Sequence, residues 1–219
     1  MAKFAAALLE AHEDDLVFED GTISVKGSPA SGKSFASVAA YAYVPVPLPE
    51  GLEPGLSDEA FFEPNNNTYP FGCHISMLEI DRQTGEPTLL KLVAVDDAGH
   101  LINPLIVEGQ IHGGLAQGIG QAMIEEVVYN EDGQLVTGSF MDYAIPRAID
   151  FPRFVLAACV TPTPVNPFGA KGVGEAGTLG STPCIVAAAV DALSEFGVKH
   201  IDMMLRPEKL WRIIQGGRS

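Results

Sequence analysis

The spacing of apolar and polar positions along the chain predicts a globular α+β fold with many loops. Residues 2–12 place Phe4, Leu8 and Ala11 on one side at helical spacing, which predicts a short amphipathic helix. Residues 16–25 have apolar side chains on both sides of Asp20-Gly21, which is typical of a hairpin with a tight turn. Further helices are predicted over 34–43, 107–127 and 182–196, with a short one within 202–211. Strands are predicted over 73–81, 89–95 and 154–161, a hairpin over 128–136, and an irregular proline-spaced connector over 44–55.

Composition adds limits on the partners of the chain. Its 219 residues are 47% hydrophobic, which is enough to bury a substantial core. The formal net charge of −15, from 28 acidic and 13 basic residues, argues against a nucleic-acid partner, because phosphate binding needs clustered Lys and Arg. The N-terminal residues do not read as a signal peptide, and no run approaches the roughly twenty apolar residues of a membrane span. We therefore expect a soluble, cytoplasmic protein.

The chain has three cysteines, Cys73, Cys159 and Cys184, which lie far apart. No two of them form a CxxC pair, which argues against a zinc or iron–sulfur site built by this chain alone. We predict three buried free thiols in a reducing compartment.

One candidate for chemistry is a P-loop. Residues 27–34, Gly-Ser-Pro-Ala-Ser-Gly-Lys-Ser, match the full phosphate-binding pattern, and the apolar run 92–95 ends in Asp96-Asp97 as a magnesium-binding strand would. The strand before the motif is, however, the second arm of a short hairpin, and no alternating series of strands and helices follows. A polar surface turn is therefore the favoured interpretation of residues 27–34.

The second candidate is spread over three glycine-rich blocks, at 97–104, 108–120 and 169–177. Glycines allow the backbone to approach a ligand closely, and Gln110 offers both donors and an acceptor to the edge of a heterocycle. Around Lys171, the glycines expose consecutive N–H groups that can bind an anion. Glu175 has only small neighbours, so its carboxylate is free to take a proton from a metal-bound water or hydroxide.

Each block also has a simpler explanation. Glycines on an apolar helix usually mark close helix packing, and Lys171 and Glu175, four residues apart, could form a solvated ion pair. The three blocks together favour a functional site, with Glu175 as its active-site carboxylate.

These blocks, with residues 141–146, resemble the C-terminal half of the molybdenum-cofactor-binding large subunit of the xanthine dehydrogenase and aldehyde oxidase family. Residues 53–56, 67–72, 108–114 and 169–173 resemble the carbon monoxide dehydrogenase branch in particular. The resemblance extends from near residue 1 to about residue 215, and it implies an α+β molybdopterin-binding domain with mixed sheets and packed glycine-rich helices.

The resemblance also implies a cofactor and roles for individual residues. The cofactor would be the molybdenum cofactor in its molybdopterin cytosine dinucleotide form, with iron–sulfur clusters on a small partner subunit and FAD on a medium one. Glu175 would be the base beside molybdenum that activates a hydroxide for attack on the substrate carbon, without ligating the metal. Cofactor-binding positions would be Gln110, Lys171, Gly172, Val173 and Gly174.

The chain departs from the family in length. The upstream glycine-rich cofactor loop and the copper-binding cysteine loop of the carbon monoxide dehydrogenases have no counterpart here, so we expect residues 1–219 to be an incomplete portion of the cofactor-binding domain. The upstream half, or a separate chain that supplies it, would complete the site. The resemblance implies oxidation of an aldehyde, an N-heterocycle or carbon monoxide with oxygen from water. The alternatives are a P-loop nucleotide-binding protein and a non-catalytic remnant.

Overall fold

The protein is described by a computed structural model, which describes residues 1–216. The chain divides into two compact units, one formed by residues 1–63 and the other beginning at Pro64. Each unit has its own cluster of buried apolar side chains, so each is described separately.

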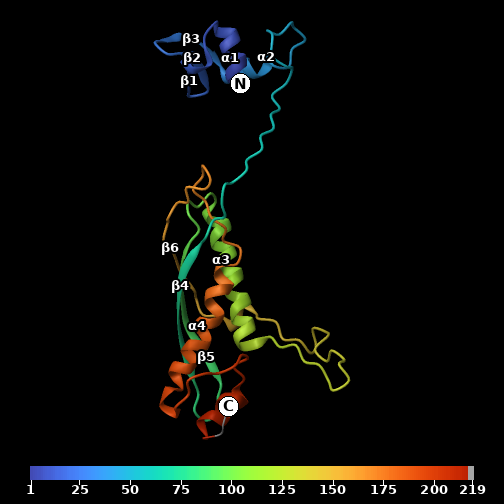
Figure 1. Cartoon of the computed structure of the whole chain (residues 1–219), viewed down its shortest axis with the longest axis vertical. Coiled ribbons are helices and arrows are strands. Elements are labelled where there is room, and N and C mark those ends of the chain that lie inside the picture. The colour runs from blue at the N-terminus through green and yellow to red at the C-terminus, as the bar shows by residue number, and fades with distance from the viewer. Residues whose placement is uncertain (217–219) are drawn as a thin grey trace. The chain divides into compact units, whose positions relative to one another are not determined.

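The first unit is a three-stranded antiparallel sheet with two short helices (Figure 1). Its elements are α1 (Ala2–Leu9), a 3₁₀ turn (Glu13–Asp15), β1 (Leu16–Glu19), β2 (Thr22–Val25), β3 (Ser28–Ser34) and α2 (Phe35–Tyr41). The predicted hairpin over 16–25 and the predicted helices over 2–12 and 34–43 are confirmed, with shorter helices than expected. Phe4, Ile23 and Val38 are buried between the helices and the sheet.

The segment with the P-loop pattern is a β-strand. Residues 28–34 form β3, and Ile23 of β2 pairs with Lys33 in an antiparallel register. In an extended strand the backbone N–H groups point alternately to opposite sides, so they cannot surround a phosphate as a P-loop does. The nucleotide-binding alternative is therefore wrong.

The second unit contains a mixed sheet in the order β4-β5-β6. Its strands are β4 (Phe71–Ile80), β5 (Pro87–Asp97) and β6 (Val155–Ala158); β4 and β5 are antiparallel, and β6 runs parallel to β5. The turn between β4 and β5 is stabilised by Asp81, whose Oδ1 accepts hydrogen bonds from the N–H groups of Gln83 and Thr84 at 2.8 Å each. These hydrogen bonds lower the pKa of Asp81. The strands predicted over 73–81, 89–95 and 154–161 are confirmed.

Two long helices cover one face of this sheet. Figure 1 shows α3 (Pro104–Ile119) and α4 (Ala176–Ala192) running side by side, and α4 packs directly on β4. Asn103 caps α3 by accepting a hydrogen bond from the N–H of Ile106 at 3.3 Å. A Cβ atom added at Gly177 would lie 2.6 Å from the carbonyl oxygen of Ile111, so the absence of a side chain there lets the two helices touch along their backbones. Gly114 and Gly118 of α3 therefore do mark close packing, as one interpretation of the sequence held, whereas Gly109 and Gly113 have nothing within 4 Å.

The remaining elements are short. They are a π-helix (Gly120–Ile124), 3₁₀ turns (Ala148–Asp150 and Ser194–Phe196) and α5 (Pro207–Ile214), which confirms the short helix expected near the C-terminus. The hairpin predicted over 128–136 is reduced to one bridge between Tyr129 and Leu135. The helix predicted to begin at Thr182 begins six residues earlier, at Ala176, and Pro183 lies inside it.

The prediction of three buried thiols is wrong. Cys73 and Cys159 are exposed, and Cys184 is half-buried. Cys73 is exposed because residues alternate between the two faces of β4, and its neighbour His74 takes the face that α4 covers. None of the described helices is long and apolar enough to cross a membrane.

Candidate active site

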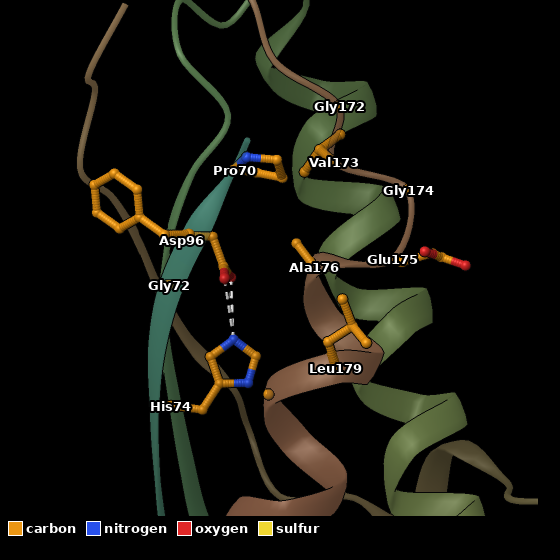
Figure 2. A pocket seen from close by; sticks show the side chains of 12 residues that line it. Pro70, Gly72, His74, Asp96, Gly172, Val173, Gly174, Glu175, Ala176 and Leu179 are labelled. Carbon is orange, nitrogen blue, oxygen red and sulfur yellow. Dashed lines mark hydrogen bonds and ion pairs between the residues drawn. The ribbon is translucent and has the colours of Figure 1, made fainter. Parts of the chain in front are cut away.

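A pocket of about 470 Å³ opens where the first residues of β4 face the N-terminal end of α4 (Figure 2). One wall is the loop over residues 172–175, which leads into α4. Its volume is within the roughly 300–1,000 Å³ that is typical of small-molecule sites. The lining residues are Pro70, Phe71, Gly72, His74, Asp96, Gly172, Val173, Gly174, Glu175, Ala176, Leu179 and Gly180.

The loop over 172–175 presents free hydrogen-bond donors. None of its four backbone N–H groups donates to another group within residues 1–216. A Cβ atom added at Gly172 would meet nothing within 4 Å, so the backbone is open to a ligand. The loop also precedes the positive end of the α4 dipole, which favours anions. Three residues predicted to bind the cofactor, Gly172, Val173 and Gly174, are therefore brought together here.

Glu175 is the residue immediately before α4. It occupies the N-cap position, yet its side chain makes no capping hydrogen bond, and the residue is exposed. Figure 2 shows the carboxylate directed away from His74 and Asp96. The carboxylate is therefore available to a group bound beside the loop.

Gln110 reaches the same loop from α3. Its Oε1 lies 3.9 Å from the position that a Cβ atom would take at Gly174, and the residue is exposed. The two glycine-rich blocks that contain Gln110 and Glu175 are thus neighbours in space, although Gln110 does not line the pocket itself.

The floor of the pocket contains a buried pair that the sequence did not reveal. Nε2 of His74 lies 3.1 Å and 3.3 Å from the two carboxylate oxygens of Asp96, and the two side chains are 2% and 4% exposed. A Cβ atom at Gly72 would lie 2.2 Å from Oδ1 of Asp96, and one at Gly180 would lie 2.4 Å from Nδ1 of His74. The two glycines therefore provide the space that the pair occupies. Nδ1 of His74 is buried without a partner among the described residues.

Lys171, the fifth predicted cofactor residue, is oriented differently. Its Nζ lies 2.5 Å from Oδ2 of Asp97, with the side chains only 9% and 0% exposed. The alternative of a solvated pair between Lys171 and Glu175 is therefore wrong. Burial acts to raise the pKa of Asp97, but hydrogen bonds from Lys171 and from the N–H groups of Thr161 and Gly99 outweigh it and lower that pKa.

The donors near the pocket suit a ligand rich in acceptors. The free N–H groups of residues 172–175 and the carboxamide of Gln110 match the carbonyl, ring-nitrogen and phosphate groups of a pterin nucleotide. Within residues 1–216 there is no cluster of three or more His, Cys, Asp or Glu side chains that could hold a metal ion directly. The free N–H groups and the Gln110 carboxamide fit an organic cofactor that is rich in acceptor atoms.

Comparison with known sequences identifies a family and individual relatives of the chain. Residues 1–152 match the family described as the molybdopterin cofactor-binding domain. The carbon monoxide dehydrogenase large chain of Hydrogenophaga pseudoflava is 42% identical over 213 residues, which are 97% of this chain and 26% of that protein. The nicotine 6-hydroxylase large subunit of Paenarthrobacter nicotinovorans is 38% identical over 97% of this chain and 26% of its own length. The chain thus spans about a quarter of these relatives.

Solved structures agree with the sequence comparison. Quinoline 2-oxidoreductase from Pseudomonas putida 86 superposes with a TM-score of 0.89 at 40% identity, over 99% of this chain and 28% of that one. The Cu,Mo-containing carbon monoxide dehydrogenase in its carbon monoxide reduced state gives 0.88 at 39% identity, over 98% and 27%. The predicted α+β fold and the resemblance seen in the sequence are confirmed. The chain belongs to the molybdopterin cofactor-binding domain family, in the group that contains the large subunits of xanthine dehydrogenase-type molybdenum hydroxylases.

Proposed function

We propose that this chain forms one side of the cofactor pocket of a molybdenum hydroxylase, with Glu175 as the catalytic base. The observation that carries the proposal is the position of Glu175. Its carboxylate is exposed and makes no capping hydrogen bond to α4. It lies at the end of a loop whose N–H groups donate to no described residue. Membership of the molybdopterin cofactor-binding family supports it.

The molybdenum cofactor would supply the redox centre, which accepts two electrons from the substrate. The N–H groups of Gly172, Val173 and Gly174 would bind acceptor atoms of the cofactor, and the Gln110 carboxamide would donate to it from α3. Glu175 would accept the proton released when water provides the oxygen atom, because a carboxylate beside the reacting group can act as a general base.

Several further assignments belong to this proposal. The cofactor is the molybdopterin cytosine dinucleotide, and electrons leave through iron–sulfur clusters and FAD on partner subunits in the cytoplasm. The rest of the large subunit, as a longer chain or a separate one, completes the pocket. The substrate is an aldehyde, an N-heterocycle or carbon monoxide; relatives named for nicotine, quinoline and carbon monoxide support this range.

The direct test is Glu175→Gln in the complex purified from its native host. We expect turnover to fall by about 10²–10⁴-fold, the usual contribution of a general base, with molybdenum content unchanged. Asp191→Asn is a matched control, because Asp191 lies near the other end of α4 and is also exposed; its turnover should equal that of the wild type.

Two outcomes contradict the proposal. Wild-type turnover in Glu175→Gln would remove Glu175 from the reaction. Absence of molybdenum from the wild-type complex would favour the non-catalytic remnant.

A further inference from the structure

Lys171 precedes the loop that carries Glu175, but its charge is used elsewhere. It does not line the pocket, and its ammonium contacts the carboxylate of Asp97 instead. Its Nζ also lies 5.2 Å from the centre of the Phe71 ring, on the outer face of the sheet. The backbone N–H of Lys171 donates to the carbonyl oxygen of Ala98 at 2.8 Å. Both kinds of donor on Lys171 are therefore engaged within the chain.

Asp97 joins three segments that are distant in the sequence. Its Oδ1 accepts hydrogen bonds from the N–H of Gly99 at 2.8 Å and from the N–H of Thr161 at 3.0 Å, while Oδ2 accepts from Lys171. The end of β5, the segment after β6 and the start of the glycine loop thus meet at one carboxylate. The Asp97 carboxylate has no exposed surface and accepts hydrogen bonds from all three segments. It holds them together strongly, because an unpaired buried charge is very unfavourable.

The backbone around the ion pair is closely fitted. Gly99 and Gly169 have φ angles of 64° each, in the left-handed region that glycine tolerates. A Cβ atom at Gly99 would lie 2.1 Å from the carbonyl oxygen of Gly169, and that same oxygen accepts the N–H of His100 at 3.0 Å. The residues just before Lys171 are thereby fixed against the end of β5.

Beyond Lys171 the loop has few internal restraints. The N–H groups of residues 172–175 donate to no described residue, and only the partly buried side chain of Val173 packs against the core. The carbonyl oxygen of Val173 accepts the N–H of Ala176, at the start of α4, at 3.2 Å. The direction in which the loop leaves the sheet is therefore set mainly by Lys171 at one end and by the first turn of α4 at the other.

We infer that the buried Lys171–Asp97 ion pair positions the glycine loop and Glu175, and that Lys171 is a positioning residue rather than a ligand of the cofactor. The part of the inference that concerns Glu175 as a catalytic base rests on the proposed function. The part that concerns the ion pair and the loop does not. A positioning role and a cofactor-binding role of Lys171 predict different stability and molybdenum content when the charge of Asp97 is removed together with that of Lys171.

The first experiment uses the full chain and the variants Lys171→Met, Asp97→Asn and the double variant. Lys171→Met leaves a buried carboxylate unpaired, so its melting temperature should fall by on the order of 10 °C. The double variant removes both charges and should regain at least half of that loss. Hydrogen exchange at Thr161, whose N–H donates to Asp97, should accelerate in Lys171→Met and slow again in the double variant.

Arg82→Met is the matched control for this experiment. Arg82 is also paired with an acidic residue, Glu195, but both side chains are more than half exposed. Its melting temperature should stay within about 2 °C of the wild type, because exposed pairs contribute little. A similarly small change in Lys171→Met would overturn the inference.

The second experiment separates positioning from ligation in the complex purified from the native host. A positioning role predicts that Lys171→Met and the double variant both keep the molybdenum content and KM of the wild type. Lys171→Met should lower kcat by about 10²-fold through a misplaced Glu175, and kcat should also fall in the double variant, which lacks the ion pair. A double variant that melts like the wild type but lacks molybdenum would show that Lys171 is a ligand, and would overturn the inference. If Glu175→Gln were fully active, the proposed function would fail, yet melting and hydrogen exchange would still decide whether the ion pair fixes the loop.

Discussion

Two consecutive aspartates at the end of β5 illustrate how single residues determine this site. Asp96 faces α4 and pairs with His74 in the floor of the pocket, while Asp97 faces the other side of the sheet and pairs with Lys171. This division follows from the alternation of side chains along a strand. One short sequence thus builds both the pocket floor and the support of the loop that forms its wall.

The lowered pKa of Asp97 predicts a defined dependence of stability on pH. Because the pKa is lower in the folded chain than in the unfolded one, the carboxylate stabilises the fold fully above the unfolded value of about 4. This stabilisation is lost as the pH falls below about 4, through the folded pKa. Asp97→Asn should lower the free energy of unfolding at pH 7 by roughly 3 kcal/mol and by much less under acid conditions. Urea denaturation from pH 7 to pH 3 measures both; a constant difference between wild type and variant would contradict the assignment.

Sequence reasoning found only the residues whose neighbours in the chain reveal them. The local glycine pattern and the resemblance led to Glu175 and to the loop before it. His74 and Asp96 are 22 positions apart, and Lys171 and Asp97 are 74 apart. No local pattern encodes such pairs, because they depend on strand register and on the path of the loop after β6. The sequence showed both aspartates at the end of the run 92–97, but it did not show that His74 and Lys171 are their partners.

At the scale of elements, the contact between α3 and α4 brings Gln110 to the glycine loop. The two helices approach through Gly114 and Gly177, whose Cα atoms have no side chain between them. The sequence predicted both helices but placed the start of α4 at Thr182, six residues after its actual start at Ala176. Packing on β4 and α3 extends α4 by these six residues. The helix propensities of the residues alone do not predict such packing.

This close contact predicts opposite effects for two glycine substitutions. Gly177→Ala would place a methyl group 2.6 Å from the carbonyl oxygen of Ile111, so the helices must separate, which lowers stability by roughly 1–3 kcal/mol. Gly113→Ala, on the exposed side of α3, meets nothing within 4 Å and should stabilise the chain by about 0.5–1 kcal/mol. Chemical denaturation of the two variants measures both effects. Equal effects of the same sign would show that helix contact is not limiting.

For the whole molecule, the division into two units places every candidate site residue in the second one. The sequence suggested a single portion of a cofactor-binding domain, since both units lie within the extent of the resemblance. The proline-spaced connector over 44–55 was visible, but it belongs to the first unit rather than to the boundary between the units. The boundary follows from which side chains share a core, and that information is spread over the whole chain.

Separate cores predict separate unfolding. Ile23 is fully buried in the first unit, so Ile23→Ala should destabilise that unit by roughly 2–5 kcal/mol. Amides of β1–β3 should then lose protection in hydrogen exchange, while those of β5 and α4 keep the wild-type rates. The reverse is expected for Leu92→Ala, because Leu92 is fully buried in the second unit. Loss of protection throughout the chain in either variant would show that the units unfold together.

The exposed cysteines have a practical consequence. Cys73 shares the outer face of β4 with Ile75 and Met77, and Cys159 follows β6. A thiol-alkylating reagent should modify both in the isolated chain, and each should become unreactive when another polypeptide covers its strand. Cys184, half-buried with its Sγ 3.2 Å from the hydroxyl of Ser76, should react more slowly and provides an internal reference. The two exposed thiols therefore report, by mass spectrometry, whether another polypeptide covers β4 or the segment after β6.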